Sequence, residues 1–168
     1  MRVIYQSDSI IIREFQPEDQ ALFSRLFENA GVTRYLPPRT PQEYVELFHK
    51  ALADYHKSVF SRWGIFRAAD DDFIGICVVR EFADVPGQVE IGYVLSEAYW
   101  GKGVAVETSK ALIKYCFEHT DTSEVVAVTD LDNIGSRKVL LKAGFTQLNN
   151  LMREEQPLAY FMIRREEV

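Results

Sequence analysis

The chain has 168 residues, a length typical of one domain, and we expect a single domain over residues 1–168. Apolar residues make up 47% of it and charged residues 26%, which indicates a folded globular protein and excludes a disordered one. The net charge of -6 disfavours nucleic-acid binding, and no apolar run is long enough to cross a membrane. We therefore expect a soluble, cytoplasmic protein with no nucleic-acid or membrane partner.

The first half of the chain predicts a strand, two helices and then three strands. A β-branched run predicts a strand over residues 9–14, and Pro17 begins a helix that we expect Gly31 to stop. A capping box at Thr40 begins a second helix, which should end near residue 56. Short polar connections then join strands that should form an antiparallel meander, over residues 59–67, 73–82 and 89–95.

The second half predicts a crossover unit. A helix over residues 105–119 leads to a strand over residues 124–129, which should be parallel to the strand over 89–95. Three further elements follow, namely a helix from Asn133 through Ala143 that Gly144 stops, and strands over residues 145–148 and 158–163. Together these elements predict an α+β fold.

The cysteines and histidines do not form a metal-binding pattern. Cys77 and Cys116 lie far apart inside apolar runs, so we expect two buried, reduced thiols. The three histidines fall on predicted helices without the spacing of metal ligands. No metal is therefore predicted.

The most informative segment lies between the strand over residues 89–95 and the helix after it. Gly101 and Gly103 allow a tight turn, and the unsatisfied N–H groups of the first helical turn attract anions such as phosphate. Lys102 either adds a charged contact or is solvated. A glycine-rich turn with no ligand explains the same residues. The spacing excludes a P-loop and a dinucleotide fingerprint, since Val106 stands where the latter has its third glycine.

Three segments carry a pattern in a fixed order: Glu90–Leu95 (EIGYVL), Tyr99–Ala105 (YWGKGVA) and Asn133–Phe145 (NIGSRKVLLKAGF). Together they resemble the GNAT acetyltransferase superfamily, and within it the branch of the RimJ and RimL ribosomal-protein N-terminal acetyltransferases. The resemblance covers nearly the whole chain. It implies a GNAT fold, which is a mixed, mostly antiparallel sheet of about seven strands with a splayed parallel pair and about four flanking helices.

The resemblance also implies that the chain uses acetyl-CoA and releases CoA. The pyrophosphate loop of the family corresponds to Trp100, Gly101, Lys102, Gly103, Val104 and Ala105, and the pantetheine arm would add like a strand to the backbone of Tyr93, Val94 and Leu95. Further cofactor contacts are implied at Asn133, Ser136 and Lys142. Because Trp100 replaces the family's Arg or Gln, more of the pyrophosphate binding should come from main-chain N–H groups.

Two residues are candidates for catalysis. The strand alternation directs Glu90 into the expected cleft, where it would act as general base, but an exposed strand residue or a binder of a cationic acceptor fits equally. Other GNAT branches use a tyrosine where this chain has Leu140, so Ser136 or water would protonate the thiolate. Helix capping alone also explains Asn133 and Ser136. A main-chain N–H, that of Val94, would contact the carbonyl oxygen.

We expect direct transfer in a ternary complex, because neither cysteine lies near these motifs. The first candidate for the acceptor is a protein or peptide N-terminal amine, and the second is a small amine such as a polyamine, an amino acid or an aminoglycoside. The missing tyrosine also leaves room for a non-catalytic acyl-CoA sensor. Residues 33–38 and 149–156 are expected to form loops around the acceptor, and a monomer and a homodimer both remain open.

Overall fold

The computed structural model describes residues 1–168, which fall into two compact units. Unit 1 comprises Met1–Val78 and Tyr93–Val104, and unit 2 comprises Val79–Gly92 and Ala105–Val168. The strands follow the order β1-β2-β3-β4-β5-β6-β8-β7, and β5 and β6 are a parallel pair in a mostly antiparallel sheet. None of the helices combines the length and the hydropathy that a membrane crossing requires.

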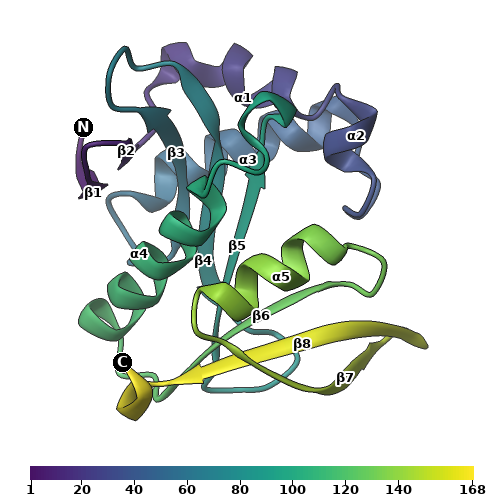
Figure 1. Ribbon diagram of the computed structural model, residues 1–168. Helices are drawn as coiled ribbons and strands as arrows, with labels where there is room; N and C mark the ends of the chain where they lie inside the picture. The colour runs from purple at the N-terminus through teal and green to yellow at the C-terminus, as the bar shows by residue number, and fades with distance from the viewer. The chain divides into compact units, whose positions relative to one another are not determined.

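The α+β fold is confirmed, with eight strands and five α-helices in place of about seven and about four (Figure 1). The strands are β1 Val3–Gln6, β2 Ile10–Arg13, β3 Ser61–Arg67, β4 Phe73–Glu81, β5 Val89–Leu95, β6 Glu124–Asp130, β7 Thr146–Arg153 and β8 Gln156–Arg164. The α-helices are α1 Gln20–Leu26, α2 Ala30–Thr33, α3 Pro41–Asp54, α4 Val104–His119 and α5 Ile134–Lys142, and the 3-10 helices are η1 Pro17–Asp19, η2 Glu97–Tyr99 and η3 Arg165–Glu167.

An aromatic core holds α1 and α3 in unit 1. The rings of Phe15, Phe23 and Phe48 are fully buried and meet in pairs whose centroids lie 5.4 to 5.6 Å apart. Aromatic pairs with this geometry contribute stability beyond the area they bury. The predicted capping box of α3 is confirmed, because Glu43 N donates to Thr40 Oγ1 at 3.2 Å and Thr40 N donates to Glu43 Oε1 at 2.8 Å.

In unit 1 one prediction was wrong and one strand was missed. The first helix does not run to Gly31 but ends at Leu26, and Gly31 lies inside the short helix α2. Asn29 explains the new start, because its Oδ1 accepts hydrogen bonds from Gly31 N and Val32 N as an N-cap residue does. Strand β1 was missed, since its four residues are exposed or half-buried and carry no clear alternation of burial.

Unit 2 confirms the predicted crossover. The parallel register of β5 and β6 pairs Val89 with Val125 and Glu90 with Val126. Ile91 and Gly92 have no register partner in β6, which agrees with a parallel pair that separates after its first residues. Helix α5 ends where predicted, and Gly144 follows it in the left-handed region at a φ of 109°.

The expected loop over residues 149–156 does not exist. Strand β7 continues to Arg153, and β8 begins at Gln156, so the two form one long hairpin (Figure 1). Glu154 and Glu155 make the turn at positive φ values of 50° and 66°, which suits a two-residue hairpin turn but is uncommon for residues other than glycine. Neither residue signals such a turn in the sequence, and the irregular register between Leu148 and Leu151 interrupts the alternation of β7.

Candidate functional site

The glycine-rich turn before α4 has the left-handed backbone that a tight turn needs, and it is open. Gly101 and Gly103 have φ values of 71° and 83°, in the left-handed region that favours glycine. A Cβ atom at either position would meet nothing within 4 Å, so the backbone there is uncovered. The helix that follows has 16 residues, and the N–H groups of its first turn point back along its axis. This end of the helix can therefore accept a phosphate group.

Trp100 connects the turn to the end of β5 through its side chain. Its Nε1 donates to the main-chain oxygen of Leu95 at 2.9 Å, while the side chain remains 47% exposed. The indole N–H is thus committed to the end of β5 and is not a donor to a ligand in this arrangement. Sequence reasoning placed Trp100 in the loop but missed this supporting contact.

Tyr99 fastens the same turn to the connection between β3 and β4. Its hydroxyl donates to Asp72, and the guanidinium of Arg67 and the ammonium of Lys102 lie 5.8 and 5.7 Å from the centre of its ring. Arg67 in turn forms an ion pair with Asp70. Burial raises the pKa of Tyr99, and the hydrogen bond to Asp72 raises this pKa further. Side-chain contacts therefore hold Tyr99 in place just before the two glycines.

At the end of β5 a ligand would meet the backbone rather than the side chains. The side chain of Val94 packs against the phenylalanine core of unit 1. A Cβ atom on Gly75 of the neighbouring strand would lie 2.2 Å from the Val94 carbonyl oxygen, so β4 accommodates this stretch only because residue 75 is glycine. Tyr93 is half-buried and Leu95 is buried. These residues form a constrained strand end directly before the glycine turn.

Glu90 lies in unit 2, and its side chain is only 7% exposed. The structure excludes the alternative in which Glu90 is an exposed strand residue. Arg80 Nε donates to Glu90 Oε1 at 2.7 Å, and Arg80 itself is 44% exposed. A charge-assisted hydrogen bond of this kind stabilises a carboxylate that burial would otherwise disfavour. Sequence reasoning found Glu90 but not its partner, because the two lie on different strands.

The residues at α5 that were expected to contact the cofactor also have structural roles. Asn133 Oδ1 accepts from Ser136 N at 3.1 Å, so the predicted capping role is confirmed. Ser136 is half-buried in the first turn, and Lys142 is exposed in the last turn, where a cation complements the helix dipole. Leu140, at the position where other branches have a tyrosine, is buried. These observations are compatible with cofactor contacts at Asn133, Ser136 and Lys142 but do not require them.

Both cysteines are buried and free, as predicted. Burial raises the pKa of Cys116 to about 12 and raises that of Cys77 as well. A thiol acts as a nucleophile in its thiolate form, which a raised pKa makes rare at neutral pH. This environment disfavours an acyl-cysteine intermediate.

Comparisons with known proteins agree with these features. Residues 9–146 match the model of a family described as "Acetyltransferase (GNAT) domain". The uncharacterized N-acetyltransferase YoaA of Bacillus subtilis is 29% identical over 154 residues, covering 90% of this chain and 86% of that protein. Spermidine N(1)-acetyltransferase of Escherichia coli is 27% identical over 146 residues, covering 87% and 77%. The solved structure of RimL, a ribosomal L7/L12 α-N-protein acetyltransferase in complex with coenzyme A, superposes with a TM-score of 0.83 at 15% identity, covering 99% of this chain and all of that one.

Proposed function

The chain belongs to the GNAT family of N-acetyltransferases, and from this premise we propose that it transfers the acetyl group of acetyl-CoA directly to a primary amine in a ternary complex. We further propose that one acetyltransferase domain spans residues 1–168 and works in the cytoplasm. The observation that carries the proposal is the uncovered turn at Gly101 and Gly103, at the start of a 16-residue helix.

In this proposal the turn holds the pyrophosphate of acetyl-CoA. The contacts come from the main chain of Trp100 through Ala105, and Lys102 adds a positive charge. The fit is supported by the positive φ angles, by the open space above both glycines and by the indole of Trp100, which braces the turn instead of filling it. The backbone of Tyr93 through Leu95 would hold the pantetheine arm, and Asn133, Ser136 and Lys142 are proposed as further contacts.

Acetyl-CoA supplies a thioester whose C–S bond breaks as the amine nitrogen bonds to the carbonyl carbon. Glu90 takes the proton that the amine must lose, directly or through a water molecule. The N–H of Val94 donates to the carbonyl oxygen, where negative charge develops. Ser136 or water returns a proton to the departing sulfur, so that an amide and a free thiol are formed. An α-amine, with an ordinary pKa near ~8, needs less help from a base than a lysine amine near ~10.4.

For the acceptor we propose a protein or peptide N-terminal amine, as in the RimJ and RimL branch. The support is the Tyr99–Ala105 segment and the similarity in fold to RimL. A second candidate is a small amine, because a relative with 27% identity is named as a spermidine acetyltransferase. The acidic net charge suits either cationic acceptor.

Mass spectrometry after incubation with acetyl-CoA distinguishes the acceptors. Peptides with free N-termini, the same peptides with blocked N-termini, spermidine, free amino acids and an aminoglycoside are offered separately and as a mixture. We expect acetylation of free peptide N-termini to be the most efficient reaction. Preferred acetylation of spermidine, with peptides untouched, would replace the first candidate by the second.

A further inference from the structure

We propose that a pocket in unit 1 binds the carboxylate of an amine acceptor through Arg25. The inference rests on the proposed transferase function and narrows its substrate class. The acceptor would be an amine that also carries a carboxylate, such as an amino acid or an acidic peptide, rather than a polyamine.

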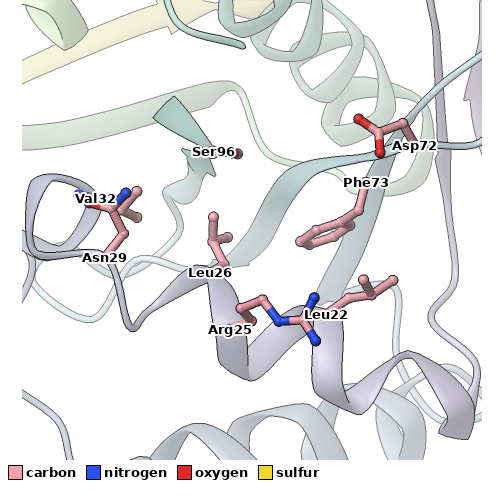
Figure 2. A pocket seen from close by; sticks show the side chains of 8 residues that line it. All are labelled: Leu22, Arg25, Leu26, Asn29, Val32, Asp72, Phe73 and Ser96. Atoms are coloured by element: carbon pink, nitrogen blue, oxygen red, sulfur yellow. Dashed lines mark hydrogen bonds between the residues drawn. The ribbon is translucent and has the colours of Figure 1, made fainter. Parts of the chain in front are cut away.

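The pocket has a volume of about 280 Å³ and lies beside α1. Figure 2 shows the side chains that line it, which come from α1, from the segment through α2, from the start of β4 and from the residue after β5. They are Leu22, Arg25, Leu26, Asn29, Val32, Asp72, Phe73 and Ser96. The volume is near the lower end of the range for small-molecule sites, so a compact ligand such as an amino acid suits it.

Arg25 is a charged residue of this pocket whose side chain has no partner within the protein. Its side chain is exposed and makes no ion pair or hydrogen bond, whereas Arg13, Arg67 and Arg80 each hold a carboxylate. A guanidinium presents several N–H donors in a planar fork that matches the two oxygens of a carboxylate. The pocket therefore retains an anion-binding group that the protein itself does not use.

The other polar groups of the pocket are already engaged. Asn29 Oδ1 accepts from the N–H groups of Gly31 and Val32, and Asp72 accepts from the hydroxyl of Tyr99. Asp72 still carries its negative charge into the lining, so it repels a carboxylate and attracts a cationic group. The opposite charges of Arg25 and Asp72 thus favour a ligand that has both an anionic and a cationic group, and they favour one orientation of that ligand in the pocket.

Apolar side chains complete the pocket. Leu22 and Leu26 lie on the same face of α1, four residues apart, and Val32 and Phe73 provide further apolar surface. A short aliphatic group of a ligand can contact this apolar surface while its carboxylate meets Arg25. A polyamine has no anionic group to pair with Arg25, so of the two charges only Asp72 would favour its binding.

The position of the pocket along the chain connects it with the transfer reaction. Ser96 lines the pocket and directly follows Leu95, the last residue of the strand proposed to hold the pantetheine arm. Ser96 N donates to the Ile74 oxygen at 2.8 Å, so the strand end and the pocket wall share one fixed backbone segment. The wall of the pocket therefore continues directly from the strand that we propose to hold the pantetheine arm.

The test measures binding apart from turnover. Backbone amide signals are followed by NMR while the protein, without acetyl-CoA, is titrated with 4-methylpentanoate or with its uncharged amide. We expect 4-methylpentanoate, but not its uncharged amide, to shift the signals of residues 22–32, 72–73 and 96. Arg25→Gln should weaken this binding at least about tenfold, since hydrogen bonds to charged groups are typically of that strength. Arg39→Gln, an equal change of charge at an exposed site outside the pocket, should not weaken it.

Two results would overturn the pocket assignment: equal shifts with the uncharged amide, or unchanged binding in Arg25→Gln. Acceptor assays separate this failure from failure of the transferase proposal. If amines are acetylated but Arg25→Gln leaves the KM of every carboxylate-bearing acceptor unchanged, the pocket assignment is wrong and the transferase proposal stands. If the carboxylate binds at Arg25 but no amine is acetylated, the transferase proposal fails.

Discussion

The Nε atom of Arg80 donates a 2.7 Å hydrogen bond to Oε1 of Glu90, joining a half-exposed guanidinium to a buried carboxylate. Truncating one partner of such a pair leaves the other charge unpaired in a poorly solvated place, which is costly. The pair therefore fixes the position of the Glu90 carboxylate, and mutation of either partner tests what this position contributes.

For Glu90→Gln we expect kcat/KM to fall by about 10²-fold or more, the usual contribution of general base catalysis. The loss should be greatest at low pH, where less of the amine is neutral. Measurement of kcat/KM across the pH range, on the true acceptor, checks this. An unchanged profile would remove Glu90 as the base.

Arg80→Gln provides the complementary variant. It removes the 2.7 Å hydrogen bond and the positive charge that position the Glu90 carboxylate, but it keeps a polar side chain. We expect kcat/KM to fall, because a general base must lie within hydrogen-bond reach of the proton that it takes. An unchanged kcat/KM in Arg80→Gln, with Glu90→Gln impaired, would show that the pair does not position the base.

Gly103→Ala tests the cofactor turn. An alanine at a φ of 83° is strained by about 1–2 kcal/mol, and its methyl group would occupy the open space where we place the pyrophosphate. We expect the KM for acetyl-CoA to rise at least several-fold and thermal stability to fall. Gly87→Ala is the matched control, because Gly87 has a φ of 89° and equally open surroundings in the turn between β4 and β5. An equal rise of the KM in both variants would show that backbone strain, not loss of a binding surface, is responsible.

Tyr99 provides a prediction about pH. Because burial and the hydrogen bond to Asp72 raise its pKa in the folded state, the bond should be intact below the ordinary tyrosine pKa near ~10. Its stabilising effect should be lost only as the pH rises through the higher folded value. The difference in tyrosinate absorbance between the native protein and Tyr99→Phe reports this titration. Ionisation at or below the ordinary pKa would contradict the assigned environment.

Ser136→Ala should lower kcat more than it weakens acetyl-CoA binding, if the hydroxyl protonates the thiolate. Asn133→Ala measures the stability that the cap contributes, since it removes the bond to Ser136 N and should cost about 1 kcal/mol. Steady-state kinetics and CoA titrations of both variants decide the matter. Weaker binding with an unchanged kcat in Ser136→Ala would reassign the residue to the binding of acetyl-CoA.

The parts of the fold that sequence reasoning predicted are those with strong local signals. The capping box at Thr40 and the left-handed Gly144 each depend on residues close together in the chain. The crossover from β5 to β6 could be predicted because a strand, a helix and a strand, each with a clear local pattern, follow one another. The β7–β8 hairpin was missed because its turn is made by Glu154 and Glu155, which rarely adopt positive φ. Long-range pairing of the strands, not local preference, imposes that turn.

The candidate site shows the same contrast between local signals and long-range contacts. The left-handed glycine turn could be predicted and Glu90 could be proposed, because both belong to short motifs beside clear secondary structure. The contacts that support them could not, since Arg80 and Asp72 reach their partners from other strands and turns. The pocket at Arg25 also could not be predicted from the sequence, because helix α1, strand β4 and Ser96 meet only in the folded unit 1.

The central claim is that this chain is an enzyme rather than an acyl-CoA sensor, and amine-dependent release of CoA tests it most directly. The free thiol is measured while acetyl-CoA is mixed with the protein and with a panel of peptide, polyamine, amino acid and aminoglycoside acceptors. We predict many turnovers of CoA release that require an amine and that match the amide formed one to one. Tight CoA binding with no amine-dependent release on the whole panel would contradict the account.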